Sequence, residues 1–219
     1  MDASQGGGGA DTVVVSAPTT TPRGAIWAPE IGKRLRTQGT RYAVGVVDMT
    51  KPALILVGPP GSGKSTVGRR VAERLGVGFK DLDDDLRDAH GLEAGELVVE
   101  LGRERFQELE VEALRSVLDS FGGVLALGGG TPTAPGAAEL LAGRAVVFLD
   151  VDLDNLLRRE GLLPLHPWLL PNPRAHLRQL LTERRPVYES VASATVVTSG
   201  RDPADVVADV LSALPAAAS

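Results

Sequence analysis

The chain has 219 residues, of which 43% are hydrophobic and 23% charged, a composition ordinary for a globular protein with one well-buried core. Its formal net charge of −5 argues against a nucleic-acid partner, because proteins that bind nucleic acid usually present a basic face to the phosphates. Cysteine is absent, which excludes disulfides and thiolate metal sites and fits a reducing cytoplasm, and no apolar stretch approaches the roughly 20 residues of a membrane-spanning helix.

Residues 1–50 differ in composition from the rest of the chain. Up to about Gly24 they are rich in Gly, Thr and Pro and show almost no apolar periodicity. We expect an N-terminal extension that is disordered or dispensable, although residues 42–47 also have the composition of a short strand. A chain that started at Met49 would place an apolar strand directly after its start, so a mis-assigned start is a second interpretation.

From residue 51 onward, apolar runs of strand length alternate with segments of helical period. This pattern predicts an α/β fold, a five-stranded parallel sheet flanked by helices. The predicted strands are 54–57, 79–82, 124–127, 145–151 and 194–198, and the predicted helices include 64–75, 97–119 and 174–185. Four prolines between residues 164 and 173 exclude one continuous helix there and predict a mobile loop.

The run GPPGSGKST, from Gly58 to Thr66, matches the phosphate-binding P-loop pattern in full and lies between an apolar strand and an amphipathic helix. Glycines allow the backbone N–H groups to point at the phosphates, and the helix N-terminus adds partial positive charge. Lys64 is expected to bridge the β- and γ-phosphates, and the Ser65 hydroxyl to ligate Mg²⁺. The nucleotide-binding residues predicted from this run are Gly61, Ser62, Gly63, Lys64, Ser65 and Thr66.

Two further segments separate a kinase from other P-loop proteins. Asp81 and Asp83 alternate where the second strand should end, which would place both carboxylates on one side at the carboxyl edge of the sheet. One carboxylate can orient hydrated Mg²⁺ while the other accepts a proton from an acceptor hydroxyl. The second segment is the triple glycine 128–130, which follows a strand and leaves backbone N–H groups open to a polar ligand. A solvated acidic turn and a plain loop are the alternatives for these two segments.

Taken in order, these motifs resemble the shikimate kinase family, a branch of the P-loop kinases related to nucleoside-monophosphate kinases. The resemblance covers residues 52–214. It rests on the phosphate loop, the acidic run 79–83, Gly91, the segment 106–110, the triple glycine, the run RRPVY from Arg184 and the run RDP from Arg201.

The resemblance implies a monomeric P-loop kinase domain over residues 51–219, with a substrate-binding helical segment and a lid at about 158–174. It implies phosphorylation of the 3-hydroxyl of shikimate by ATP with Mg²⁺, on the route to aromatic amino acids. By the same resemblance, Asp81 lies near Mg²⁺, Asp83 binds the acceptor hydroxyls as the catalytic carboxylate, and Lys64 acts on the phosphates. Gly129 and Arg184 bind the substrate, with Arg184 at the substrate carboxylate, and Arg201 lies against the adenine.

Two positions depart from the family pattern, and each lacks an expected arginine. Gln107 stands where the family has an arginine that binds the substrate carboxylate, and a glutamine amide offers a weaker, neutral donor. Arg103, one helical turn earlier, is a candidate for compensation. In the lid, His166 replaces an arginine that reaches the ATP phosphates, and Arg158, Arg159 and Arg174 flank the same loop.

These departures leave two alternatives open. One is a kinase for a related polyhydroxylated cyclic acceptor, for which the missing arginine is an adaptation. The other is an ATP-binding regulatory homologue that has lost catalysis. Retention of Arg184 favours an anionic acceptor, and retention of Lys64, Ser65, Asp81 and Asp83 favours an active enzyme.

Overall fold

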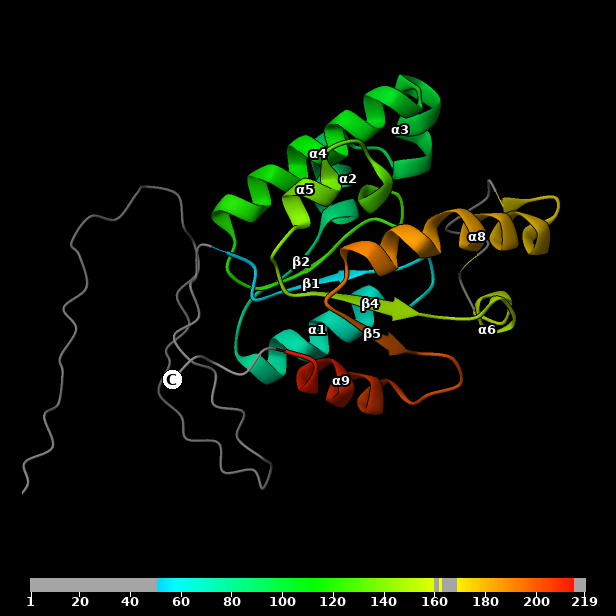
Figure 1. Ribbon diagram of the computed structural model, residues 1–219. Helices are drawn as coiled ribbons and strands as arrows, with labels where there is room; N and C mark the ends of the chain where they lie inside the picture. The colour runs from blue at the N-terminus through cyan, green and yellow to red at the C-terminus, as the bar shows by residue number, and fades with distance from the viewer. Residues whose placement is uncertain (1–50, 160–161, 163–168, 215–219) are drawn as a thin grey trace, which may run out of the picture. The chain divides into compact units, whose positions relative to one another are not determined.

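A five-stranded parallel sheet forms the core of the domain in the computed structural model, which describes residues 51–159, 162 and 169–214. The strand order is β2-β3-β1-β4-β5 (Figure 1). The strands are β1 (Leu54–Val57), β2 (Phe79–Asp81), β3 (Val124–Ala126), β4 (Val146–Asp150) and β5 (Ala194–Val197). All five predicted strands and the parallel sheet are confirmed, whereas the predicted extension 1–50 and His166 lie outside the described residues.

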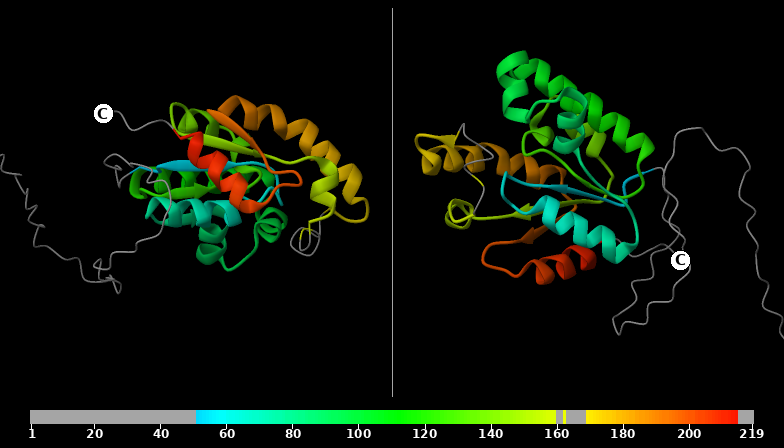
Figure 2. Two further views of the ribbon diagram at one scale, coloured as in Figure 1. Left: turned by 90° about the horizontal axis from the view of Figure 1, so that it is seen from below. Right: turned by 180° about the vertical axis from the view of Figure 1, so that it is seen from behind.

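Helices cover both faces of the sheet. On one face lie α1 (Lys64–Leu75) and α9 (Pro203–Ser212), and on the other lie α4 (Arg103–Ser120), α5 (Ala137–Leu141) and α8 (Pro173–Val191) (Figures 1 and 2). Shorter helices connect these elements: α2 (Leu82–His90), α3 (Ala94–Leu101), the 3₁₀ turn η1 (Thr131–Thr133) and α6 (Leu153–Leu157). The result is a three-layered α/β domain.

The central strand β1 shows why the sheet is buried on both sides. Successive side chains of a strand point to opposite faces. Leu54 and Leu56 accordingly join the apolar cluster under α1 and α9, while Ile55 and Val57 join the cluster under α4 and α8. All four are 0% exposed, which explains an uninterrupted apolar run in place of an alternating pattern.

One predicted helix is divided in the structure. The expected helix 97–119 is two helices, α3 and α4, separated by Gly102. Gly102 has φ of 81° and ψ of 157°, an extended conformation with positive φ that residues with a side chain rarely adopt, so the chain changes direction there. After this break, α3 packs against α2 and α4. Leu86, Leu97 and Phe106 form a small separate apolar cluster between these helices. The predicted helix 174–185 is confirmed and is longer, as α8.

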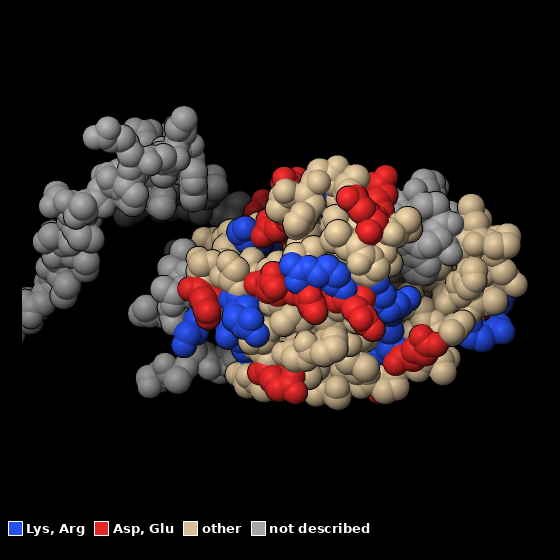
Figure 3. Space-filling model, turned by 90° about the horizontal axis from the view of Figure 1, so that it is seen from above, with Lys and Arg blue, Asp and Glu red and all other residues tan. Residues whose placement is uncertain are grey.

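The outward face of α4 carries charges that are paired with one another. The guanidinium of Arg105 lies 2.6 Å from the Glu108 carboxylate and 3.7 Å from that of Glu112. Figure 3 shows basic and acidic side chains side by side on the face seen from above. Such exposed pairs contribute little to stability, but they neutralise the charge of this face locally. Among the described residues, no helix is long and apolar enough to cross a membrane.

Burial of the α1 face predicts a difference between two matched substitutions. Val71 on α1 is 0% exposed and Val99 on α3 is 87% exposed. Val71→Ala removes two buried methyl groups and should lower the free energy of unfolding by about 2 kcal/mol. Val99→Ala, with the same chemistry and a slight gain in helix propensity, should leave it unchanged or slightly higher. Urea denaturation of both variants tests this, and equal effects would contradict the core assignment.

Candidate functional site

The phosphate loop joins the end of β1 to the start of α1. Gly61 and Gly63 have φ of 78° and 96°, so the chain turns through left-handed conformations before the first helical residue, Lys64. The N-terminal amides of α1 therefore open onto the carboxyl edge of the sheet, where the helix end favours anions. Ser62 is buried, and Thr66 is exposed in the first turn of α1.

The Lys64 side chain folds back over this loop. Its ammonium donates to the carbonyls of Gly58 and Pro59 at 2.9 and 3.1 Å. Burial lowers the pKa of Lys64, whereas the charges of Asp83 and Asp81 act in the opposite direction. An ammonium that lies over the phosphate loop, within electrostatic reach of two carboxylates, is suited to contact phosphates.

Ser65 and Asp81 are in direct contact. The Ser65 hydroxyl donates to the Asp81 carboxylate at 2.6 Å, across the gap between α1 and the end of β2. A hydroxyl and a carboxylate are hard oxygen donors, the kind that Mg²⁺ prefers. The structure therefore brings together the two residues predicted to hold the metal.

Asp83 reaches the site by a route different from the predicted one. The strand β2 ends at Asp81, and Asp83 lies in the first turn of α2, where its N–H donates to the Asp81 carboxylate at 3.2 Å. The strand alternation expected for these two residues is therefore wrong, and the N-terminal turn of α2 positions Asp83. Burial and, next, the charge of Asp81 raise the pKa of Asp83 to about 6, against the opposing effect of Lys64.

The triple glycine allows three elements to meet. A Cβ on Gly128 would collide with the carboxylate of Asp83, and a Cβ on Gly129 would lie 2.8 Å from the Pro60 ring. Only residues without side chains leave room for these contacts. The turn after β3 therefore packs directly against α2 on one side and against the phosphate loop on the other.

Arg184 connects α8 to the same turn. Its guanidinium donates to the carbonyl of Gly129 at 2.9 Å, and Tyr188 donates to that carbonyl at 2.6 Å. The two predicted substrate-binding residues Gly129 and Arg184 are thus in contact. Gln107 is half-buried on α4, and Arg103, the first residue of that helix, is exposed. Within the described part of the chain, Arg103 makes no hydrogen bond or ion pair, which gives no support to its predicted compensating role.

Glu110 belongs to the site, although sequence reasoning assigned it no role. It lies on α4, is 2% exposed, and accepts a hydrogen bond from Thr131 at 2.6 Å. Burial raises the pKa of Glu110 to about 7, against the effect of the Thr131 hydrogen bond. A signal existed in the sequence, because Glu110 falls on the apolar stripe of α4 between Phe106 and Leu114. A carboxylate on a buried stripe indicates a functional residue.

The base of the predicted lid packs over the phosphate loop. Leu156 and Leu162 approach within 3.2 Å and 3.0 Å of the point where a Gly61 Cβ would stand, and Arg159 approaches within 3.9 Å. Of the three arginines that flank the lid, Arg159 therefore lies beside the phosphate loop, where its Cγ approaches Gly61. Arg174 is paired with Asp154 at 2.8 Å.

The side chain of Arg201 makes its hydrogen bonds with β5 and α9. It follows β5, is exposed, and its guanidinium lies 2.5 Å from Asp209 on α9. Its predicted position against an adenine stays a prediction.

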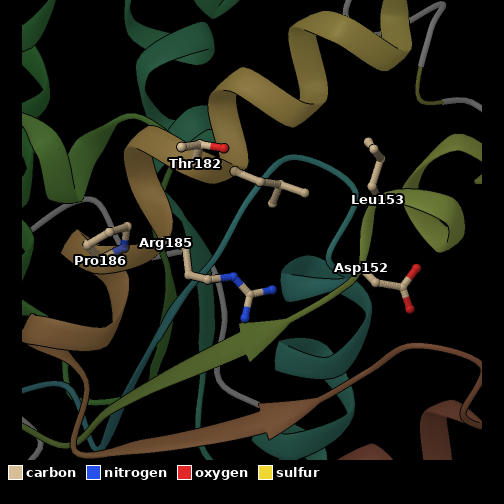
Figure 4. Close-up of a pocket in the computed structure, with 6 residues that line it drawn as sticks. Asp152, Leu153, Thr182, Arg185 and Pro186 are labelled. Carbon is tan, nitrogen blue, oxygen red and sulfur yellow. The ribbon is translucent and has the colours of Figure 1, made fainter.

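A separate cavity of about 330 Å³ lies beside α8, lined in part by Asp152, Leu153 and Thr182 (Figure 4). Arg185 extends from α8 toward the end of β4, where it makes two hydrogen bonds with Asp150 at 2.6 and 2.9 Å. The two neighbouring arginines thus have different partners: Arg184 contacts the triple glycine and Arg185 contacts the end of β4. The pairing anchors α8 to the sheet next to the site.

The pKa of Asp83 predicts a pH-dependent stability. Its folded-state pKa of about 6 lies above the ordinary 3.8, so the folded protein keeps a proton that the unfolded chain releases between these two values. The free energy of unfolding therefore falls as the pH rises through this window, and Asp83→Asn removes this contribution. In urea denaturation, the variant should gain stability relative to the unmodified protein as the pH rises from about 4 to about 6. A difference independent of pH would show that the Asp83 carboxyl has its ordinary pKa.

Comparison with known proteins places this geometry in a family. A family model described as shikimate kinase matches residues 60–215. A shikimate kinase from Salinispora arenicola is 47% identical over 165 residues, covering 75% of this chain and 99% of the relative. A shikimate kinase from Streptomyces coelicolor is 45% identical over 166 residues, covering 76% and 97%.

Solved structures agree with the sequence relatives. The shikimate kinase from Acinetobacter baumannii in complex with shikimate has a TM-score of 0.69 at 34% identity, covering 74% of this chain and 92% of that chain. The shikimate kinase from Aquifex aeolicus has a TM-score of 0.62 at 28% identity, covering 74% and 95%. Since the family model spans the phosphate loop from Pro60 onward, the triple glycine and α8, and the relatives match over almost their whole length, this chain belongs to the shikimate kinase family.

Proposed function

We propose that this protein transfers the γ-phosphoryl group of ATP to the 3-hydroxyl of shikimate. One observation carries the proposal: the triple-glycine turn lies against Pro60 of the phosphate loop, against Asp83 and, through its Gly129 carbonyl, against Arg184. A phosphate donor site, a carboxylate that can accept a proton and a cation for an anionic acceptor therefore surround one turn. The names of the relatives supply the acceptor, shikimate.

On the donor side, the phosphate loop and Lys64 provide the positive potential. The amides at the start of α1 are proposed to hold the phosphate oxygens, and Lys64 to exchange its carbonyl contacts with Gly58 and Pro59 for the β- and γ-phosphates. Positioning and charge stabilisation account for most of the catalysis in phosphoryl transfer.

Ser65 and Asp81 are proposed to hold Mg²⁺ together with the nucleotide. In the described ranges, no group of three or more His, Asp and Glu side chains could hold a metal ion without further ligands. Mg²⁺ in nucleotide sites keeps several waters and takes phosphate oxygens, so one hydroxyl and one carboxylate 2.6 Å apart fit its needs. When bound, Mg²⁺ neutralises charge that develops on the phosphate oxygens.

On the acceptor side, Asp83 is proposed to accept the proton of the attacking hydroxyl. Its raised pKa of about 6 makes it a stronger base than an ordinary aspartate while leaving it ionised at neutral pH. Arg184 is proposed to bind the shikimate carboxylate, and the backbone at Gly129 to contact the ring. Arg201 is retained as the residue proposed to lie against the adenine.

The two departures from the family pattern have different structural settings. Gln107 is half-buried on α4, one turn before Glu110, so an acceptor bound near Arg184 would meet a neutral amide there. His166 lies outside the described residues, but Arg159 stands beside Gly61 and is proposed to supply lid charge near the phosphates. An uncarboxylated acceptor would have no use for Arg184, and a regulatory homologue would have none for a buried Asp83. Neither alternative is favoured.

The absence of cysteine keeps the cytoplasm as the expected compartment.

A coupled assay of ADP release tests the proposal. With ATP, Mg²⁺ and shikimate, the unmodified protein should turn over, and Asp83→Asn should lower kcat by roughly a hundred- to ten-thousandfold because the base is lost. Asp88→Asn is the matched control on the same helix, since the Asp88 side chain is 77% exposed, and it should leave kcat unchanged. Turnover of an uncarboxylated cyclitol but not of shikimate would contradict the assignment.

A second prediction concerns Gln107. Gln107→Arg should lower the KM for shikimate roughly tenfold or more, because a guanidinium makes charge-assisted hydrogen bonds to the carboxylate, and should change the KM for ATP much less. Arg103→Gln, at the exposed start of the same helix, should change neither KM. Steady-state kinetics with each substrate varied in turn provides the measurement. An unchanged or higher KM in Gln107→Arg would show that the carboxylate is held elsewhere.

A further inference from the structure

The carbonyl of Gly129 accepts two hydrogen bonds from one helix. Arg184 donates at 2.9 Å and Tyr188 at 2.6 Å, and the two residues lie one turn apart on the same side of α8. A carbonyl oxygen has two lone pairs, so these two donors saturate it. The direction of the Gly129 carbonyl and the placement of the Arg184 guanidinium are therefore linked through a shared acceptor.

Tyr188 is fixed on its other side by the core. The residue is 0% exposed, and its ring packs on that of Phe148 from β4, with centroids 5.2 Å apart. Burial raises the pKa of Tyr188 to about 12, so the phenol stays protonated and remains a donor. Packing alone would not require the hydroxyl, since a phenylalanine has the same ring, and a buried hydroxyl needs a hydrogen-bond partner. The ring packing therefore fixes the position from which the hydroxyl donates to the Gly129 carbonyl.

Arg184 keeps most of its donors and its charge available. A guanidinium has five N–H donors; Arg184 donates from Nη1 to Gly129 and also lies close enough to the Tyr188 hydroxyl to act against the rise in the pKa of that phenol, which leaves further donors for a ligand. Among the described residues, the carboxylate of Glu110 forms no ion pair with Arg184; it accepts a hydrogen bond from the Thr131 hydroxyl. The tether to Gly129 therefore orients Arg184 without neutralising it, as the binding of an anion requires.

We propose that Tyr188 is a positioning residue for the acceptor: through the shared Gly129 carbonyl, its hydroxyl holds the Arg184 guanidinium in the orientation that receives the substrate carboxylate. This inference rests on the proposed function. It predicts an effect that depends on the charge of the ligand, because Tyr188 acts through Arg184 and does not itself touch the substrate.

The test compares shikimate with its uncharged methyl ester in Tyr188→Phe, which keeps the ring and removes only the hydroxyl. Calorimetry with Mg²⁺ and ADP present should show a three- to tenfold loss of affinity for shikimate, the range expected for one hydrogen bond, and a loss below about twofold for the ester. The KM for shikimate should rise in parallel, with kcat and the KM for ATP little changed. In an Arg184→Lys background, the same substitution should have no further effect on shikimate affinity.

Phe148→Leu serves as the packing control, because it loosens the ring contact and keeps the hydroxyl. It should lower the thermal midpoint and leave the affinity ratio of shikimate to ester unchanged. An equal loss for both ligands in Tyr188→Phe, or no loss for shikimate, would overturn the role of Tyr188 while leaving the proposed function intact. A failure of the unmodified enzyme to bind shikimate would instead overturn the proposed function, and this role with it.

Discussion

The close approach of the backbone at Gly128 and Gly129 is the constraint on which the site depends. Asp83 and Pro60 occupy the space that side chains at these positions would fill, so the turn after β3 brings the base and the phosphate loop together. The same turn is held from α8 through the Gly129 carbonyl. A side chain here would separate the donor and acceptor sides, and phosphoryl transfer depends on their alignment.

The pKa shifts of the charged side chains in the site follow from this close packing. Burial is the main cause of the lowered pKa of Lys64 and of the raised pKa of Asp83, and the neighbouring charges of the site act on both groups. The raised pKa of Asp83 costs stability at neutral pH, as is common where a site is organised for chemistry. Glu110 is a second buried carboxylate; it accepts a hydrogen bond from Thr131 and forms no ion pair with Arg184 among the described residues. The acceptor side can thus retain a cation for its ligand.

Local patterns predicted the fold better than the site. The strands, α1 and the phosphate loop follow from apolar runs and glycine spacing, which act within a few residues. The break at Gly102 was not predicted, because the apolar stripe of Leu97 and Leu101 continues at helical spacing into α4. The side chain of Asp83 was placed by extending strand alternation past the end of β2, and this was wrong because α2 follows β2 without a connecting residue.

The sequence by itself determined the parallel sheet and the phosphate loop, because both are specified by local spacing and periodicity. Motif order was enough to indicate the family. Only the tertiary structure decided which side chains share an acceptor or a space: Asp83 against Gly128, Thr131 with Glu110, and Tyr188 with Arg184 at one carbonyl. These contacts join residues up to 59 positions apart in the chain, so no local pattern encodes them, and the packing of helices on the sheet creates them.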